Sequence, residues 1–179
     1  MICIIGKHDR RRWRQSWGRK TQIIFHNPET KMKVLALDPA TKTGYEHTNG
    51  FGGVWDCSIK KDESSGMRFL RLYAHLTDVY ENHGIDLVLF ESPGNKKFIR
   101  SVVIQAKIQG TIELWCTHHN VEYEPISPMT IKVFATGSNK STKEEMISAA
   151  KPFIGRRKVR GSDHADAICL LQWGLKQYS

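Results

Sequence analysis

Lys33-Val-Leu-Ala-Leu-Asp38 and Asp86-Leu-Val-Leu-Phe-Glu91 decide the fold that this sequence predicts. Each segment is a short apolar run that ends on an acidic residue. Runs of this length and composition are typical of strands buried on both faces, which occur where helices cover a sheet. The two segments therefore predict buried strands in an α/β domain, with a carboxylate at the end of each strand.

Helical and extended patterns alternate along the rest of the chain. Gly44-Tyr45 and Asn49-Gly50 are turn signals, so residues 51–59 are predicted to form the partner strand of a hairpin. A further short strand is expected at residues 121–126. The predicted helices span residues 67–82, 98–117, 128–135, about 142–150 and 163–178. This order indicates a mixed central β-sheet flanked by helices.

The positive charge of the chain is unevenly placed. The 179 residues carry a net charge of +9, which favours a polyanionic partner, with nucleic acid first and an anionic membrane surface second. Residues 1–31 contain eight basic and only two acidic residues. We interpret residues 1–31 as a basic N-terminal extension, either disordered or non-native, and residues 32–179 as the folded domain.

Composition also limits the class of protein. The hydrophobic fraction of 40% is enough for a core, and no apolar run is long enough for a transmembrane helix. The four cysteines are scattered without a CxxC pair. This arrangement favours reduced thiols in a cytoplasmic protein over a zinc site or a disulfide framework.

Four acidic residues form the candidate active site. Asp38 and Glu91 end the two buried strands, and Asp163 and Asp166 share one face at the start of the last predicted helix. If the strands are neighbours and the helix packs across their ends, the four carboxylates converge. Converging carboxylates repel each other unless cations lie between them, and oxygen ligands select Mg²⁺ or Mn²⁺. We therefore predict a site for two divalent ions, a type of centre that hydrolyses phosphodiesters.

Each acid taken alone also has a structural interpretation. Asp163 follows Ser162 and could simply cap the helix, and Glu91 could be a turn residue before Ser-Pro-Gly. His164 lies between the two aspartates and is a secondary candidate for a ligand or a proton shuttle. Only the occurrence of all four acids, in this order, favours the metal site.

Five segments, taken in order, match a known family. They are Leu35-Ala-Leu-Asp38-Pro39, Thr43-Gly44-Tyr45, Val88-Leu-Phe-Glu91, Gly137-Ser138 with Lys140, and Asp163-His164-Ala165-Asp166-Ala167. This set resembles the RuvC family of Holliday junction resolvases over residues 32 to about 173. Compact viral members look most similar, because the first loop is short and Ala40 stands where many members have glycine.

The resemblance implies a ribonuclease H-like fold, a homodimer and Mg²⁺-dependent, symmetrical nicking of four-way and other branched DNA, leaving a 5′-phosphate and a 3′-hydroxyl. It implies that Asp38, Glu91, Asp163 and Asp166 are the catalytic acids that bind two Mg²⁺ ions, for which Mn²⁺ can substitute. No small-molecule cofactor and no membrane association are expected. The expected location is the cytoplasm, or the host cytoplasm or nucleoid for a viral protein.

Two lysines match the family's lysines near the scissile phosphate. Lys132 lies in a predicted helix and Lys140 lies beside the break at Gly137-Ser138. A cation at either position would stabilise the charge that develops on the phosphate. The alternative for each lysine is an exposed surface charge.

Two basic clusters flank the acids in sequence and are predicted to contact DNA phosphates. The clusters consist of Lys96, Lys97, Phe98 and Arg100 after Glu91, and of Arg156, Arg157, Lys158 and Arg160 before Asp163. Phe98 is the candidate for the aromatic wedge of the family, or else the first core residue of its helix. The Arg/Trp stretch in residues 1–31 could add further contacts, or could be a disordered tail.

Two other functions use the same features. The first is a nuclease of the same fold that cuts RNA/DNA hybrids or flaps, which the acids alone do not distinguish from a junction nuclease. The second is a catalytically silent protein that binds branched DNA. The intact set of four acids argues against the silent protein.

Overall fold

The computed structural model describes residues 32–93 and 99–178. Its strands are β1 (Val34–Asp38), β2 (Lys42–His47), β3 (Gly52–Asp56), β4 (Leu87–Glu91) and β5 (Glu122–Ile126). Its helices are α2 (Met67–His83), α3 (Ile99–His119), α4 (Pro128–Thr136), α5 (Lys143–Ala150), the 3₁₀ helix η1 (Lys151–Phe153) and α6 (Ser162–Tyr178). The predicted extension, residues 1–31, lies outside the described residues.

The five strands form one mixed sheet in the order β3-β2-β1-β4-β5. β1 pairs antiparallel with β2 and parallel with β4, and β4 pairs parallel with β5. The two strands that the apolar runs predicted are therefore neighbours at the centre of the sheet. The predicted mixed sheet with flanking helices is confirmed.

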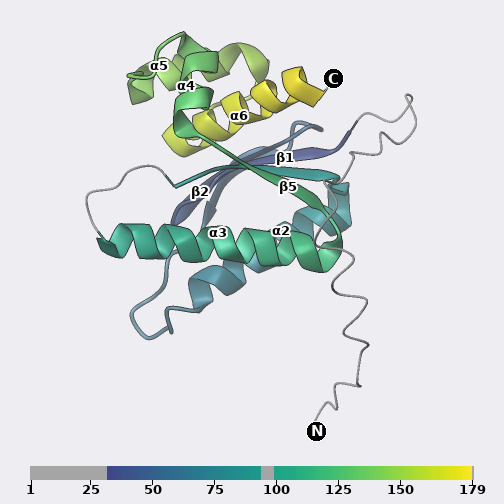
Figure 1. Ribbon diagram of the computed structural model, residues 1–179, viewed down its shortest axis with the longest axis vertical. Coiled ribbons are helices and arrows are strands. Elements are labelled where there is room, and N and C mark those ends of the chain that lie inside the picture. Colours follow the sequence, from purple (N-terminus) through teal and green to yellow (C-terminus); the bar gives the residue numbers. More distant parts are fainter. Residues whose placement is uncertain (1–31, 94–98, 179) are drawn as a thin grey trace, which may run out of the picture. The chain divides into compact units, whose positions relative to one another are not determined.

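Helices cover both faces of this sheet (Figure 1). α2 and α3 lie on one face, and α4, α5 and α6 lie on the other. The helices predicted at 67–82, 98–117, 128–135 and 163–178 are confirmed to within two residues at each end. Each face has its own apolar core, so β1 and β4 are buried on both sides, as the unbroken apolar runs require.

One part of the hairpin prediction is wrong. Gly44 and Tyr45 lie inside β2 rather than in a turn, and the chain reverses only at Asn49-Gly50, where Gly50 has a positive φ of 85°. β3 consequently covers only residues 52–56 of the predicted strand. The glycine at position 44 serves a close contact between elements, not a change of chain direction.

That contact joins β2 to the beginning of α6. A Cβ atom on Gly44 would lie 1.9 Å from the carbonyl oxygen of Asp163, so the two backbones touch. Further along α6, a Cβ atom on Gly174 would lie 2.2 Å from Cδ1 of Leu89. α6 therefore crosses the sheet from β2 to β4, packed tightly at both points.

The alternation of side chains along the strands determines where the strand-end acids point. Leu37 and Phe90 belong to the core under α2 and α3, whereas Ala36 and Leu89 belong to the core under α6. Successive side chains in a strand face opposite sides of the sheet. Asp38 and Glu91, two residues beyond Ala36 and Leu89, therefore continue the rows that face α6.

β3 and β5 are the edges of the sheet. β5 is mostly exposed and contains Pro125, which has no backbone N–H and is tolerated at a sheet edge. The hydroxyl of Tyr178, in α6, donates a hydrogen bond to Glu124 of the same strand. Within the described ranges no helix is long and apolar enough to cross a membrane, and Cys57, Cys116 and Cys169 are buried free thiols.

We expect Gly44→Ala to destabilise the protein by about 3 kcal/mol, because the added methyl group meets backbone that must move. Gly66→Ala is the matched control, since its φ of −67° suits alanine and a Cβ atom there would have only Oγ of Ser64 nearby, at an ordinary contact distance of 3.6 Å. Denaturant unfolding of both variants measures the difference. Equal stability of the two variants would contradict the close packing of α6 on β2.

Candidate metal centre

Three elements bring the four predicted acids to one end of the sheet. Asp38 and Glu91 end the neighbouring parallel strands β1 and β4, and both are partly buried on the α6 side. Asp38 pairs with Gly44, the residue on which the first turn of α6 rests. Asp163 and Asp166 are in that first part of α6. The fold thus supplies the backbone arrangement on which the predicted metal site depends.

Asp166 is the most perturbed of the four acids. Burial raises the pKa of Asp166 to about 6, and the negative charge of Asp163 adds to the effect. Its Oδ1 atom is buried and has no hydrogen-bond partner among the described residues. A buried carboxylate oxygen without a partner costs free energy, and a bound cation would remove that cost. The environment of Asp166 therefore fits a metal ligand.

The side chains themselves are not gathered into a finished ligand set. Among residues 32–93 and 99–178, no three histidine, cysteine, aspartate or glutamate side chains lie close enough together to hold one ion. Asp163 is engaged locally, because Oγ of Ser162 donates to its Oδ1 at 3.0 Å. The placement of the strands and of α6, together with the unpartnered oxygen of Asp166, carries the metal-site prediction.

Two lysines act electrostatically on Asp166. The charges of Lys132, in α4, and Lys143, at the start of α5, both lower its pKa against the effect of burial. Lys132 was predicted near the site and Lys143 was not. The predicted Lys140 is exposed in the turn after α4, where its backbone N–H donates to Oγ of Ser138 at 3.2 Å.

The basic loop before α6 divides into two kinds of residue. Arg157 donates to Glu46 of β2 and to the carbonyl oxygen of Gly50, at 2.6 Å in the latter case. A Cβ atom on Gly53, in β3, would lie 3.1 Å from Nη1 of Arg160, so that side chain packs along the edge strand. Arg156 and Lys158 are exposed and suit the predicted contact with phosphates.

The other predicted DNA-binding cluster is only partly described. Lys96, Lys97 and Phe98 lie outside the described residues. For Arg100 the backbone is part of α3. The predicted roles of these residues remain predictions.

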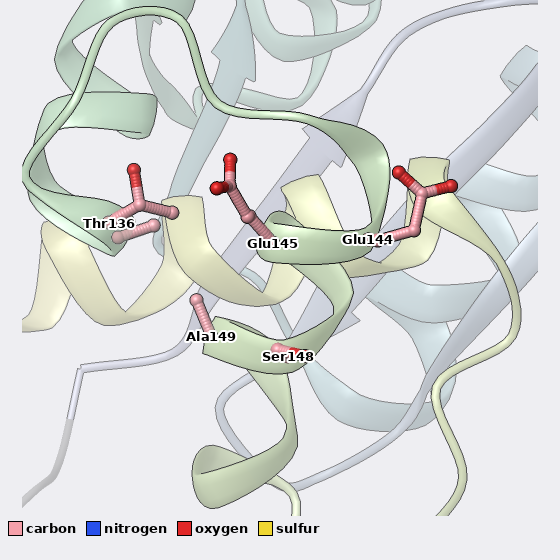
Figure 2. Close-up of a pocket in the computed structure, with 6 residues that line it drawn as sticks. Thr136, Glu144, Glu145, Ser148 and Ala149 are labelled. Atoms are coloured by element: carbon pink, nitrogen blue, oxygen red, sulfur yellow. The ribbon is translucent and has the colours of Figure 1, made fainter.

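A hollow of about 420 Å³ lies between α4 and α5 (Figure 2). Its lining consists of Ala135, Thr136, Glu144, Glu145, Ser148 and Ala149, which include none of the predicted site residues. Glu145 has a structural role there, because its side chain accepts from the backbone N–H of Thr142 at 2.8 Å in a capping box. The hollow is therefore separate from the candidate metal centre.

Sequence reasoning overlooked two features of the site. Lys143 lies inside the capping-box motif that marked the start of α5, so it was interpreted only as part of a helix end. Glu46 was overlooked because Gly44-Tyr45 was interpreted as a turn. With β2 recognised as a strand, alternation places Gly44 and Glu46 on one face, toward α6.

In sequence, the chain is similar to bacterial crossover junction endodeoxyribonucleases. It is 27% identical over 152 residues to the crossover junction endodeoxyribonuclease RuvC of Caldicellulosiruptor saccharolyticus, a match that covers 78% of this chain and 89% of that protein. It is 26% identical over 146 residues to the protein of the same name from Campylobacter lari, covering 78% and 92%. No family model matches the chain.

Solved structures agree with the sequence matches on the fold. Thermus thermophilus RuvC superposes with a TM-score of 0.63 at 19% identity, covering 78% of this chain and 90% of that one. The same protein in complex with a Holliday junction substrate gives a TM-score of 0.66 over the same coverage. The ribonuclease H-like α/β fold is thereby confirmed.

The raised pKa of Asp166 predicts how stability depends on pH. Because its pKa is about 6 in the folded protein and 3.8 ordinarily, the folded protein holds this proton more tightly. In a chelator, the free energy of unfolding should therefore fall as pH rises through this window, by up to about 3 kcal/mol from this residue.

Asp166→Asn should remove that contribution and make the metal-free protein more stable than wild type at pH 7. Denaturant unfolding between pH 4 and 8 measures it, with the exposed Asp62→Asn as the control. An unchanged pH slope in Asp166→Asn would contradict the assignment.

Proposed function

From the membership of this chain in the RuvC family of crossover junction endodeoxyribonucleases, we propose that it is a metal-dependent endonuclease that resolves four-way and other branched DNA by paired, symmetrical nicks. The relatives are matched over most of their own length. Such an enzyme would act in the cytoplasm or nucleoid, where branched DNA arises.

One structural observation supports metal-dependent chemistry at the four acids. Asp166 presents a buried, unpartnered carboxylate oxygen at the end of the sheet where β1 and β4 deliver Asp38 and Glu91. A fold stabilised only by packing gains nothing from such an atom, because an unsatisfied buried oxygen destabilises it. A cation bound to this oxygen in the working enzyme would account for its presence.

Asp38, Glu91, Asp163 and Asp166 would hold two Mg²⁺ ions, for which Mn²⁺ can substitute. All four offer carboxylate oxygens, the ligands these hard cations prefer. When bound, such ions supply an activated water and stabilise the leaving oxygen of a phosphodiester. The acids would bind these ions and hold them in place. Partial burial of the acids limits the access of competing water.

Lys132 and Lys143 would neutralise charge at the scissile phosphate. Both already act on Asp166 across the site from α4 and α5. A cation fixed on a helix stabilises negative charge that develops in the transition state more than one that must first be ordered. Lys140, in the turn between these helices, remains a candidate for the same role.

Arg156 and Lys158 would contact the phosphate backbone next to the start of α6. Both are exposed, and the neighbouring Arg157 is held on the hairpin, which fixes the loop that presents them. Phosphate contacts position DNA without reading its sequence. We propose that DNA is also contacted by residues that follow Glu91 in the sequence, namely Lys96, Lys97, Phe98 and Arg100.

We propose a homodimer through the exposed side of α3. Ile99, Val103 and Leu114 are 82%, 45% and 64% exposed, and a Cβ atom on Gly110 would meet nothing within 4 Å. These positions recur at helical spacing along one helix, as in a helix-packing surface. Paired nicks need two active sites, and each chain supplies only one set of acids. We therefore propose that a second copy of the chain packs against the exposed side of α3.

The activity is tested with labelled four-way junctions in Mg²⁺. Wild type should give symmetrical nicks, and chelator should abolish them. Asp38→Asn should bind the junction with similar affinity but cut it at least about 100-fold more slowly, because it loses a carboxylate at the metal site. Gel-shift binding in chelator and product analysis on denaturing gels measure the two effects.

Parallel assays with forks, flaps and RNA/DNA hybrids separate the alternatives. Faster cleavage of hybrids or flaps than of junctions would replace the junction assignment. Salt-sensitive binding without any Mg²⁺-dependent product would indicate a silent binding protein. Wild-type rates in Asp38→Asn would overturn the site.

The dimer is tested with Val103→Glu combined with Leu114→Glu. Buried charges at the interface should convert a dimer into a monomer in sedimentation analysis and turn paired nicks into single, uncoordinated ones. Phe153→Glu is the control, because Phe153 is 45% exposed and belongs to η1 rather than to α3. A monomeric wild-type protein would exclude this interface.

A further inference from the structure

A buried carboxylate joins the hairpin, the basic loop and α6. Glu46 in β2 is only 3% exposed. Its Oε1 accepts from Nη2 of Arg157 at 2.5 Å, and its Oε2 accepts from Nη1 of Arg157 at 3.2 Å and from Nε2 of His164 at 3.0 Å. A carboxylate this deeply buried needs such partners, and each comes from a different segment beyond β2.

The hydrogen bond at Nδ1 of His164 determines which ring nitrogen carries the proton. The backbone N–H of Arg160 donates to Nδ1 of His164 at 3.0 Å. Nδ1 is therefore the acceptor, and the ring proton is on Nε2, from which it is donated to Glu46. His164 is 1% exposed, and it lies between the two predicted metal ligands of α6.

The surrounding backbone is shaped to hold this network. A Cβ atom on Gly52, opposite Glu46 in the hairpin, would lie 1.7 Å from Oε2 of Glu46 and 2.9 Å from Nε2 of His164. Only glycine leaves room for the hydrogen bond at this position. The glycine at position 52 is therefore part of what allows the hydrogen bond between Glu46 and His164.

Glu46 stays charged in this environment. Burial alone would raise the pKa of Glu46, but the hydrogen bonds from His164 and Arg157 and the charge of Arg157 outweigh it and lower the pKa below its usual value. Replacement of a buried ion pair by apolar residues of similar volume is often neutral or stabilising. What the charged network adds is a fixed direction for each group that it binds.

We propose that Glu46 is a positioning residue for the metal-binding acids of α6. Through His164 it sets the rotation of the first turn of α6 on β2, and through Arg157 it holds the basic loop to the same strand. Asp163 and Asp166 are thereby kept in one orientation toward Asp38 and Glu91. This inference rests on the proposed function.

Two substitutions at position 164 test the contact with Glu46. His164→Gln places an amide N–H near the former Nε2 and keeps the donor to Glu46. His164→Asn places an amide oxygen near the former Nδ1, so it keeps the acceptor for Arg160 and loses the donor to Glu46. Both remove the ring, and asparagine is shorter than glutamine by one methylene group, so thermal unfolding is compared for the two variants.

The primary measurement is Mn²⁺ affinity by calorimetry on the DNA-free protein. His164→Asn and Glu46→Ala should each weaken Mn²⁺ binding by about 10- to 100-fold, the usual effect of removing a group that orients a metal ligand. His164→Gln should stay within about threefold of wild type. The double variant Glu46→Ala with His164→Asn should lose no more than the larger single loss, because both break one contact.

Cleavage and DNA binding distinguish positioning from general damage. At saturating Mg²⁺, kcat on junctions should fall in His164→Asn and return in His164→Gln, while junction affinity in chelator stays unchanged. Glu63→Gln is the control, since Glu63 also pairs with an arginine, Arg71 of α2, in a more exposed position. Thermal unfolding of every variant accompanies these measurements.

Equal Mn²⁺ affinities in His164→Asn and His164→Gln would overturn the inference, whether both are retained or both are lost. Additive losses in the double variant would also overturn it. If wild type itself binds no Mn²⁺ and cuts no branched DNA, the proposed function fails and this inference fails with it. Wild-type activity with unaffected variants overturns the inference alone.

Discussion

The first turn of α6 rests directly on the backbone of β2, and the arrangement of the acidic residues depends on that contact. Gly44 leaves no side chain between the strand and Asp163, so the helix can approach as closely as the backbones allow. The same strand pairs with β1 and fixes Asp38 beside the contact. Two residues further along β2, the carboxylate of Glu46 accepts a hydrogen bond from Nε2 of His164. Hydrophobic packing alone would hold the helix on the sheet but would not fix its rotation.

Burial in this domain serves two different ends. Leu37, Phe90 and their neighbours are buried because removal of apolar surface from water drives folding. Asp166 is half-buried although burial destabilises its charged form and raises its pKa to about 6. Such a cost is typical of residues whose protonation and orientation matter for chemistry more than for stability. The carboxylate of Asp166 has a buried oxygen without a hydrogen-bond partner among the described residues, whereas the carboxylate of Glu46 already has its partners.

The apolar runs ending at Asp38 and Glu91 were sufficient to predict two central strands, because a run buried on both faces has one common explanation. The helices were predicted from spacing and caps, and their bounds were close to those observed. The interior of β2 was misinterpreted, since the local preference of Gly44 for turns gives no sign of a helix that packs against it from 119 residues away. The charge of Lys143 near Asp166 likewise depends on how α5 packs against α6, which no local pattern encodes.

Pro125 has a consequence for how copies of this chain can associate. A strand at the edge of a sheet offers unpaired backbone groups, which invite the sheet of another molecule to continue it. Pro125 removes one donor from β5, and Glu124 nearby is tied back to Tyr178. Open-ended stacking of sheets into fibres is thereby obstructed at this border. Surfaces formed by side chains, such as the exposed side of α3, are not affected by Pro125.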